Sequence, residues 1–597
     1  NLGISVSEVS SAVLQQNTQS PAGDLGVEPM KDKQLFKLTM RTKGRLKDTK
    51  EFEDIVVRSK SDGSEIKLKD IARIELGAES YSYSSRIGGQ NSAVISITQL
   101  PEANAISLSD EIQKKMKELS KGFPQGIEYK IQRDQTEFVR ESIREVINAI
   151  ALAIVLVGIV TYLFLGSARA AFIPFCAIPV SLIGVFIFMN IFKFSINLLI
   201  LFGLVLAVGL VVDDAIVVLE NTQRHIQEGK NKVEATEITM KEVFGAVLAT
   251  SLVLMAVFVP VSFMGGITGQ MFRQFALCIA SSIGLSTLVA LTLSPALCSI
   301  ILKSDVGKAD FEFIQKFDNW FNNLRDKYLQ GALIFINSAK YTIGALVVIT
   351  ILVLGLFKLI PTGFLPSEDR GAIFMQIQLP DGSSASRTQM IADEIEDRVL
   401  KIKGVKSTIN LVGFSGENTA FIVAELEPWS KRHSKNESAD GIIDIIRKDF
   451  ANYPSAIIAT FSPPAITGLG TFGGFEYQLL DKGDRDAQKL YEEAMKFMVE
   501  ANKQTELSMI YTSYTANMPQ LLLNVDTAKA TAQGVQLSEI YTALAGYFGK
   551  SYINDFNKYG RVYRVFIQGD SDFRANPNDI EKIFVKNKII GIIRIVT

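Results

Sequence analysis

The amino-acid sequence predicts a multi-pass α-helical membrane protein that also carries α+β domains. The chain of 597 residues is too long for a single core, so several domains are expected. Apolar residues are concentrated between about residues 137 and 361, while the charge-rich flanks alternate between strand-like and helical apolar periods. The net charge of -1 gives no reason to expect the concentrated basic face of a nucleic-acid-binding protein, so that class is set aside.

Six apolar segments are long enough to cross a bilayer as helices. They lie at about 138–165, 171–192, 198–221, 241–263, 271–301 and 338–359. The connections on one side of these segments carry most of the cations: Arg169, Arg224, Lys230, Lys232, Lys303, Lys308, Lys316, Arg325 and Lys327. The short connections on the other side carry only Lys193 and Arg273. The positive-inside rule therefore places the first set in the cytoplasm and both large soluble regions on the far side of the membrane.

The first soluble region is predicted to contain two small units. Residues 1–80 read as an α/β unit with one long projecting loop, Asn17–Lys33, whose prolines and glycines exclude regular structure. Residues 81–135 are predicted to be a βαβ segment, with strands at Ala93–Thr98 and Ile127–Ile131 around an amphipathic helix.

The membrane part divides into three segments. Residues 136–305 hold five of the predicted spans, and residues 336–361 hold the sixth. Between them, residues 306–335 are predicted to form an amphipathic helix that lies in the cytoplasmic interface. Its apolar stripe consists of Phe313, Ile314, Phe317, Trp320, Phe321, Leu324 and Tyr328.

The C-terminal region is divided into three units. Residues 362–470 and 471–528 are each predicted to be a small split-βαβ unit. The expected strands are Ile373–Leu379, Thr408–Val412, Ala420–Leu426, Ala456–Phe461, Phe475–Leu480, Met509–Tyr514 and Gln520–Val525. Residues 529–597 contain an internal repeat, because Gly3–Val9 reappears as Gly534–Ile540. Such repeats are common in transporters, and we expect the chain to begin inside one copy and to stop inside the next, as a fragment would.

Two adjacent carboxylates, Asp213 and Asp214, interrupt the third apolar segment near its middle. An ionisable side chain at bilayer depth costs roughly 2.5 to 3.5 kcal/mol, so such residues are usually functional. Consecutive helical residues point about 100° apart, and the pair therefore needs partners on at least two other helices. Gly209, one turn earlier, is expected to admit another backbone closely. A nearby cation would let protonation break an ion pair and switch helix packing.

Two other interpretations of the acidic pair remain open, namely a structural polar cluster at a helix end and a metal site. No cluster of His, Cys or Met accompanies the acids, which argues against a metal. Cys176, Cys278 and Cys298 lie far apart in apolar runs and are predicted to be buried hydrophobic residues.

The stretch Gly203–Asn221 closely resembles the fourth transmembrane helix of the resistance-nodulation-division (RND) multidrug efflux pumps, of the hydrophobe/amphiphile, AcrB- and CmeB-like type. Further segments resemble family patterns: Val259-Pro260, Gly265-Gly266, Thr268-Gly269, Leu291–Cys298, Phe364–Asp369 and Ser551–Phe556. The resemblance covers nearly the whole chain, in order, and marks it as a partial copy of the inner-membrane subunit.

The resemblance implies a proton/drug antiporter, not an enzyme, in the inner membrane of a Gram-negative cell. It implies large periplasmic domains, with porter subdomains at 81–135, 362–470 and 471–528 and partial docking subdomains at 1–80 and 529–597. The resemblance implies a homotrimer that works with a periplasmic adaptor and an outer-membrane channel. The implied substrates are drugs, dyes, detergents or bile-salt-like amphiphiles. No cofactor is implied. The loop at Asn17–Lys33 would reach into a neighbouring protomer.

By the same resemblance, Asp213 and Asp214 are the proton-relay acids, and their Lys and Arg partners lie on helices that this chain lacks. Ile409, Leu411, Phe414 and Val423 fall where the family lines its deep drug pocket, and Phe461 falls on the access side. An apolar pocket with few polar groups suits varied amphiphiles.

Several features leave alternatives open. The pocket residues could instead be ordinary strand residues of a core, although Phe414 in the loop Gly413–Gly416 is an unusual choice for a solvated turn. This loop is shorter than in many relatives and lacks their second Phe. The final residues, 587–597, also depart from the family pattern, because an apolar run stands where a polar turn and a strand are expected.

Two other functions compete with drug efflux. A heavy-metal pump on the same fold should gather Met side chains in the cleft, and Met375 and Met390 alone do not make a convincing site. A non-pumping protein for lipid sensing or secretion support would not need the pocket aromatics. No phosphate-binding glycine loop is present to drive transport by nucleotide hydrolysis, so the energy is expected to come from the proton gradient.

Overall fold

The computed structural model describes residues 2–31, 35–100, 103–194, 196–303, 312–360, 368–464, 477–483, 486–504, 507, 510–587 and 591–595. Some sequence predictions fall outside these ranges: Lys308, the motif residues Phe364–Ser367, Phe475, Met509 and Lys588–Ile590.

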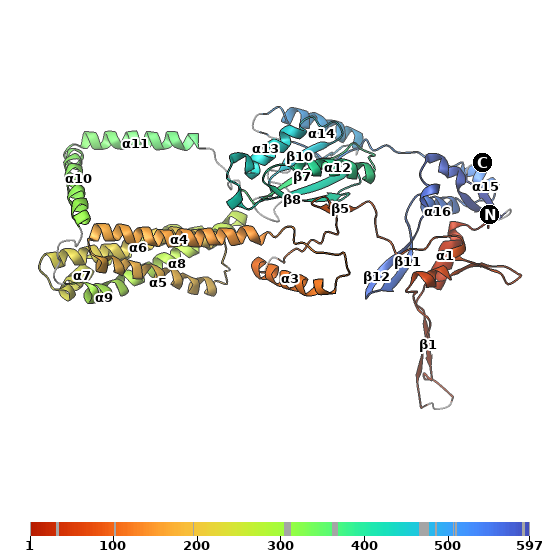
Figure 1. The fold of residues 1–597 in the computed structure, drawn as a ribbon, viewed down its shortest axis with the longest axis horizontal. Helices are drawn as coiled ribbons and strands as arrows, with labels where there is room; N and C mark the ends of the chain where they lie inside the picture. The colour runs from red at the N-terminus through yellow and green to blue at the C-terminus, as the bar shows by residue number, and fades with distance from the viewer. Residues whose placement is uncertain are drawn as a thin grey trace.

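A bundle of long helices forms the membrane part of the chain (Figure 1). Its helices are α4 (Thr136–Leu165), α5 (Ala168–Ile191), α6 (Leu198–Gln227), α7 (Lys232–Val261), α8 (Gly266–Leu291) and α9 (Leu293–Ile301). Together with α11 (Ala339–Leu359), the described residues contain 6 candidate spans that are long and apolar enough to cross a membrane, which confirms the six predicted segments. The fifth span breaks between α8 and α9 at Thr292, just before Pro295, because proline removes a helical N–H and crowds the preceding turn.

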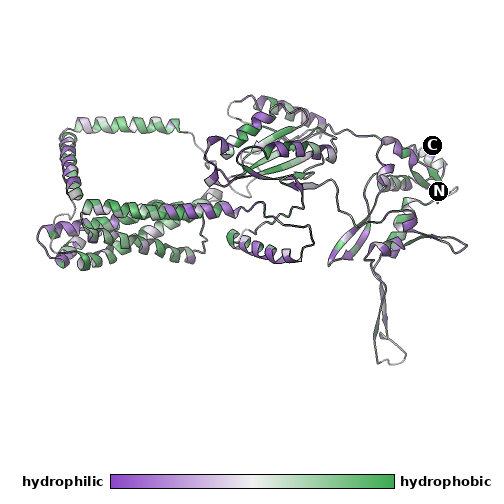
Figure 2. Ribbon diagram, in the orientation of Figure 1, coloured by the Kyte–Doolittle hydropathy of each residue, from purple (hydrophilic) through white to green (hydrophobic). Residues whose placement is uncertain are grey.

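Helix α6 occupies the middle of the bundle and packs against α4, α5, α7, α8 and α9. Its buried side includes Leu204, Ala207, Val208, Val211 and Val212, at the spacing of one helical face. Figure 2 shows that the bundle and α11 are the most continuously hydrophobic parts of the chain, as helices surrounded by lipid require.

The amphipathic helix predicted after the fifth span is α10 (Glu312–Asn337). The rings of Phe317 and Phe321 pack against Phe164 at the end of α4, with ring centroids 5.4 and 5.0 Å apart. Helix α11 contacts α10 and lies apart from the five-span bundle in Figure 1. The helix is confirmed, and its position in the membrane interface stays a prediction.

The main soluble unit is an antiparallel six-stranded sheet with the order β10-β7-β9-β8-β5-β6. The strands are β5 (Ser84–Ile87), β6 (Gln90–Asn91), β7 (Ala372–Gln378), β8 (Val405–Val412), β9 (Thr419–Leu426) and β10 (Ile457–Phe461). Helices α12 (Ala385–Val399) and α13 (Ala439–Phe450) cover one face, where Ile373, Met375 and Ile377 form the core with Ile395 and Ile446. Strand β5 joins this sheet from far away in the sequence, a pairing that the sequence did not predict.

Five predicted strand segments are not strands in the structure, and these predictions are wrong. They are Ala93–Thr98, Ile127–Ile131, Gln520–Val525 and the described parts of Phe475–Leu480 and Met509–Tyr514. The helices of both units do form, as α3 (Ala105–Leu119) and α14 (Ala487–Ala501). A strand depends on ladder hydrogen bonds to a neighbour, and these segments pair with no strand among the described residues, so their alternation alone does not make a sheet.

The internal repeat is visible as two helices that pack together, α1 (Val6–Gln16) and α16 (Leu537–Tyr547). Equivalent positions are buried in both, Val9 and Ala12 in α1 and Ile540 and Ala543 in α16. The Ser7 hydroxyl donates to Glu539 over 2.6 Å. In each copy the helix leads into a hairpin, β1 (Pro21–Leu25) with β2 (Leu38–Arg41), and β11 (Ser551–Lys558) with β12 (Arg561–Ile567).

The prediction that Asn17–Lys33 lacks regular structure is wrong, because its first part is strand β1 of a hairpin that projects from the molecule (Figure 1). Pro21 occupies the first strand position, where no ladder N–H is needed. Gly23 adopts φ +87 within a register shift between Pro21 and Asp24, so a bulge absorbs the residues that usually break strands.

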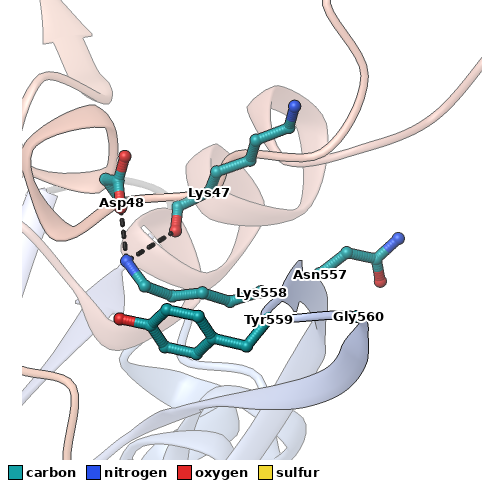
Figure 3. A pocket seen from close by; sticks show the side chains of 6 residues that line it. All are labelled: Lys47, Asp48, Asn557, Lys558, Tyr559 and Gly560. Atoms are coloured by element: carbon teal, nitrogen blue, oxygen red, sulfur yellow. Dashed lines mark hydrogen bonds and ion pairs between the residues drawn. The ribbon is translucent and has the colours of Figure 1, made fainter. Parts of the chain in front are cut away.

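The second hairpin packs on the first copy of the repeat. Phe556 of β11 meets Phe52 with ring centroids 5.7 Å apart, and the Lys558 ammonium donates to the carboxylate of Asp48 and to the Lys47 carbonyl (Figure 3). These residues line a shallow polar hollow that is separate from the six-stranded sheet. The remaining elements of the two copies are α2 (Thr49–Glu53), β3 (Val56–Ser59), β4 (Glu65–Lys67), α15 (Thr527–Ala532), β13 (Phe584–Asn587) and β14 (Gly591–Arg594).

An ion pair between Asp369 and Arg432 lies just before strand β7. The Asp369 carboxylate accepts two hydrogen bonds from Arg432, at 2.5 and 3.0 Å, and two from the backbone N–H groups of Gly371 and Ala439. Burial alone would raise the pKa of Asp369, but the bonds from Arg432, Ala439 and Gly371 outweigh burial and hold this pKa below its usual value.

We predict that Asp369→Asn lowers the free energy of unfolding by about 3 kcal/mol at pH 7, because Arg432 then lies buried without its counter-charge. The folded-state pKa is depressed, so the stability that Asp369 contributes is present above about pH 4 and is lost as the pH falls. The difference between the variant and the wild type should therefore shrink below about pH 4.

The measurement is denaturant unfolding followed by Trp429 fluorescence, with Trp320→Phe as background because the chain has 2 tryptophans. Glu427→Gln, which breaks an exposed pair with Lys431, is the control and should cost less than about 1 kcal/mol. A pH-independent difference for Asp369→Asn would contradict the proposed charge effect.

Candidate functional site

The acidic pair lies halfway along the 30-residue helix α6. Asp214 is half-buried, whereas Asp213 is exposed and forms no hydrogen bond or ion pair with the residues that the structure describes. The Ser286 hydroxyl of α8 donates to the Asp214 carboxylate at 3.2 Å and also lies 2.9 Å from the Val211 carbonyl. The side chains of the pair therefore diverge, as their helical spacing requires.

The predicted close approach of a second backbone is not at Gly209, which has nothing within 4 Å of an added Cβ. It occurs two turns earlier, at Gly203, where a Cβ would lie 3.2 Å from the Cys278 sulfur and 3.4 Å from the Phe275 carbonyl. The sequence reasoning chose the glycine nearest to the acids, but helix α8 crosses α6 at Gly203, so this detail was wrong.

The other end of α6 carries a polar cluster that the sequence did not reveal. The Glu242 carboxylate of α7 accepts hydrogen bonds from Asn221 and Arg224, both at 2.9 Å, and lies 3.0 Å from the His225 ring. The sequence alone does not show that a carboxylate on one helix pairs with a cation on the next, because the pairing depends on how the two helices pack. The cluster joins α6 to α7 at the end where cations are most frequent.

Four of the five predicted pocket residues lie on the same side of the six-stranded sheet, opposite α12 and α13. Strand register places Ile409 of β8 beside Val423 of β9, Val423 beside Phe374 of β7, and Phe374 beside Phe461 of β10. Leu411 lies two positions from Ile409 and shares its side, because strand side chains alternate. We call this side the aromatic face, and define it by Phe374, Ile409, Leu411, Phe421, Val423 and Phe461.

The rings on the aromatic face form one group. Phe374 lies at its centre, with centroid distances of 5.4 Å to Phe421 and 6.2 Å to Phe461. The two sides of β7 differ in burial, since Ile373 and Met375 are fully buried while Phe374 is half-buried. The face is thus only partly covered by the described residues, unlike the core on its other side.

The fifth predicted residue, Phe414, lies in the loop between β8 and β9 and is 72% exposed. It lines an open cavity of about 1040 Å³ together with Leu411, Tyr83 and Val94. Gly413 adopts φ +82, and an added Cβ would lie 2.1 Å from the Ser82 carbonyl, so only glycine allows this close approach. The structure therefore brings Phe414 and Leu411 to one cavity at the edge of the aromatic face.

A buried polar network supports the cavity from the α12 side. The Glu396 carboxylate, 0% exposed, accepts hydrogen bonds from Thr408 at 2.6 Å, Asn410 at 3.3 Å and the Gly89 backbone at 3.1 Å. Arg86 of β5 pairs with Asp393 at 2.5 Å and lies 3.7 Å from Glu396. These contacts fix β5 and β8 to α12, so the strands that carry Ile409 and Leu411 are held rigidly.

Three residues just before or at the start of α4 also belong to this region, and sequence reasoning missed them. Gln132 donates to Glu425 of β9 at 3.0 Å, the Arg133 guanidinium lies 5.5 Å from the centroid of Phe374, and Phe138 packs on Trp429 at 5.9 Å. Polar residues before a membrane helix usually indicate a solvated linker, so their spacing in the sequence does not predict these contacts with the sheet. The segment that leads into α4 therefore contacts the aromatic face, and α4 itself contacts Trp429.

Metal ligands do not gather in the described residues. No group of three or more His, Cys, Asp or Glu side chains that could hold an ion occurs among the residues searched. Met375 is buried in the core between the sheet and its helices, and Met390 is 66% exposed on α12, so the two methionines do not converge.

The fold and site define a class, namely polytopic α-helical membrane proteins with an acidic pair inside the bundle and α+β domains attached to it. Residues 1–596 match the family described as AcrB/AcrD/AcrF, and the chain belongs to this family of RND transporters. The family match confirms the resemblance that the sequence motifs indicated.

Three named relatives are similar to this chain along nearly its whole length. The chain is 38% identical over 587 residues to the multidrug export protein AcrF of Escherichia coli K12, covering 96% of this chain and 56% of that protein. It is 37% identical over 593 residues to the toluene efflux pump membrane transporter TtgB of Pseudomonas putida, with 97% and 56% covered. It is 36% identical over 595 residues to the multidrug resistance protein MdtF of Escherichia coli O157:H7, with 97% and 57% covered. The chain thus spans little more than half the length of these relatives.

The network behind the cavity leads to a prediction. Arg86→Leu should accelerate amide hydrogen exchange across residues 84–91 by about 100-fold, equivalent to ~3 kcal/mol, because Glu396 is left buried without a cation. Adding Glu396→Gln should recover most of the protection, because the double variant no longer buries an unpaired charge.

Exchange is read by mass spectrometry on the purified protein. Arg73→Leu, which removes an exposed arginine that pairs with Glu75, serves as the control and should leave the exchange of residues 84–91 unchanged. If the double variant exchanges as fast as Arg86→Leu alone, the charge explanation fails.

Proposed function

We propose that this chain is part of a proton-driven efflux pump for hydrophobic and amphiphilic drugs, in which protonation of Asp213 and Asp214 is coupled conformationally to drug release. The observation that carries the proposal is the acidic pair halfway along the central helix of the bundle, with Asp214 bonded to Ser286 of a neighbouring helix. Charge in this position is costly and is characteristic of proton pathways.

The available energy fits this role. One charge that crosses a membrane potential of 100 mV yields about 2.3 kcal/mol, which lies within the ~1 to 3 kcal/mol typical of coupling between two sites. Protonation of Asp214 changes its hydrogen bond to Ser286 from charge-assisted to neutral, and charge-assisted bonds are about twice as strong. The packing of α6 against α8 therefore responds to the proton.

The aromatic face and its cavity supply the drug site in this proposal. Ile409, Leu411, Phe414 and Val423 form its deep part, and Phe461 lies toward the access side. Half-buried rings with few polar neighbours bind varied apolar molecules through area and shape instead of fixed hydrogen bonds. The relatives AcrF, TtgB and MdtF are named for multidrug export, toluene efflux and multidrug resistance, which supports the same substrate class here.

Location and assembly follow from the family. We assign the bundle to the bacterial inner membrane, residues 81–135, 362–470 and 471–528 to periplasmic porter subdomains, and 1–80 and 529–597 to partial docking subdomains. The working assembly is a homotrimer with a periplasmic adaptor and an outer-membrane channel, and secondary transport makes it an antiporter and not an enzyme. The projecting hairpin β1–β2, with exposed Leu25 and Leu38, is suited to contact a neighbouring protomer.

The alternatives receive no specific support. A heavy-metal pump needs converging soft ligands, whereas Met375 is buried in the core and Met390 is exposed on α12. A non-pumping protein gives no reason for Leu411 and Phe414 to line one cavity.

The proposal predicts that Asp213→Asn and Asp214→Asn each abolish proton-driven dye efflux while trimer assembly remains intact. An amide cannot take up and release the proton, yet it matches the carboxylate in shape, so packing is preserved. Efflux of phenylnaphthylamine from energised cells and size-exclusion chromatography of the purified protein provide the two measurements. Glu220→Gln, an exposed acid on the same helix, should retain efflux. Wild-type efflux by Asp213→Asn would refute the relay.

A second prediction concerns the cavity. Phe414→Ala should weaken phenylnaphthylamine binding about tenfold, because one aromatic contact contributes ~0.5 to 1.5 kcal/mol beyond its buried area. Dye fluorescence on the protein reconstituted in nanodiscs measures the affinity. Phe573→Ala removes another exposed ring outside the cavity and should bind like the wild type, while equal losses in both variants would argue against a site at Phe414.

A further inference from the structure

Arg133 places a guanidinium on the aromatic face. It precedes α4, and its Cζ lies 5.5 Å from the centroid of Phe374, the ring at the centre of the group. This distance is within the range of a cation–π contact, in which arginine stacks over the ring. A permanent positive charge therefore borders the apolar surface formed by Phe374, Phe421 and Phe461.

The donors of this guanidinium are not used by the part of the chain that the structure describes. Arg133 makes no hydrogen bond or ion pair with the residues that the structure describes, whereas Arg86 and Arg432 each hold a carboxylate at 2.5 Å. Burial lowers the pKa of Arg133, which Glu425 partly offsets and Arg370 reinforces, but an arginine remains charged in proteins. A partly desolvated cation with five N–H donors in a fork is a site for a planar or trigonal anion.

The nearest acid does not neutralise this cation. Glu425 is occupied by Gln132, which donates at 3.0 Å, and by Lys406 at 3.2 Å. Burial, the largest effect, and Glu137 raise the pKa of Glu425 despite Lys406 and Lys130. The charged groups that act on one another here are the cations Arg133, Arg370, Lys406 and Lys130 and the acids Glu425 and Glu137, so positive charge predominates.

An apolar surface bordered by a cation that no described residue pairs suits a ligand with an apolar body and an anionic head. The body of the ligand rests on the rings of Phe374, Phe421 and Phe461, and its head accepts hydrogen bonds from Arg133. A cationic head would approach the Arg133 guanidinium and be repelled by it. A neutral amphiphile would gain only the apolar contact.

We propose that the aromatic face selects amphiphiles with an anionic head, a carboxylate, sulfonate or sulfate, and that Arg133 is the residue that recognises this head. The proposal rests on the proposed drug site and adds to it a substrate class and a specificity-determining residue.

The test uses two dyes with the same aromatic body, of which only one carries a charge. Anilinonaphthalene sulfonate differs from phenylnaphthylamine by a sulfonate, and both fluoresce when they enter an apolar site. Affinities are measured on the protein in nanodiscs, with empty nanodiscs subtracted, for the wild type, Arg133→Gln and Arg133→Lys. Arg144→Gln, an exposed arginine further along α4 that pairs with Glu141, is the matched control.

We expect the wild type to bind the sulfonate at least tenfold more tightly than the neutral dye. Arg133→Gln should remove this preference and leave the affinity for the neutral dye unchanged, Arg133→Lys should keep part of it, and Arg144→Gln should keep all of it. An equal loss for both dyes in Arg133→Gln, or no change in either, overturns the proposal. These outcomes are separate from the fate of the drug site, because a wild type that binds and exports the neutral dye still pumps even if Arg133 plays no part.

Discussion

The structure depends on the continuity of helix α4. Its 30 residues extend about 45 Å at ~1.5 Å per residue, while the hydrocarbon core of a bilayer is about 30 Å thick. The helix therefore continues beyond the membrane as one rigid rod and ends at the sheet, where Phe138 lies between Trp429 and the guanidinium of Arg370, 5.6 Å from its ring. Because α4 also packs along α6, one continuous helix joins the acid-bearing helix to the contact between Phe138 and Trp429.

The contrast between the two sides of the sheet explains why one side serves as a core and the other is available as the proposed binding surface. On the helix side, aliphatic residues such as Ile373 and Ile377 are fully buried, and the buried carboxylate there, Glu396, is held by hydrogen bonds to both of its oxygens. On the aromatic face the rings remain partly exposed. A surface held rigid from behind loses little conformational entropy when a ligand binds, so weak apolar contacts suffice for affinity.

The sequence predicted those features that depend on local periodicity and missed those that depend on distant partners. Apolar length identified the six spans, and alternation identified the strands that carry Ile409, Leu411 and Val423. The same alternation in Ala93–Thr98 gave a false strand, because pairing requires a neighbour that the pattern does not reveal. The pairing of β5 with β8 was not predicted for the same reason. The family resemblance, not periodicity, supplied the proposed roles of the acids and of the pocket residues.

Arg133 shows why a pocket cannot be derived from apolar residues alone. In the sequence Gln132-Arg133-Asp134 the charge looks like a solvated entry to a helix, and Asp134 does behave in this way, since it accepts from the Thr136 backbone at 2.8 Å. Its neighbour Arg133 is turned by the extended backbone toward the opposite side, onto Phe374. The charge that lies over the rings is thus contributed by the segment that leads into α4. This short segment therefore adds an electrostatic character to the proposed drug site that its apolar residues do not have.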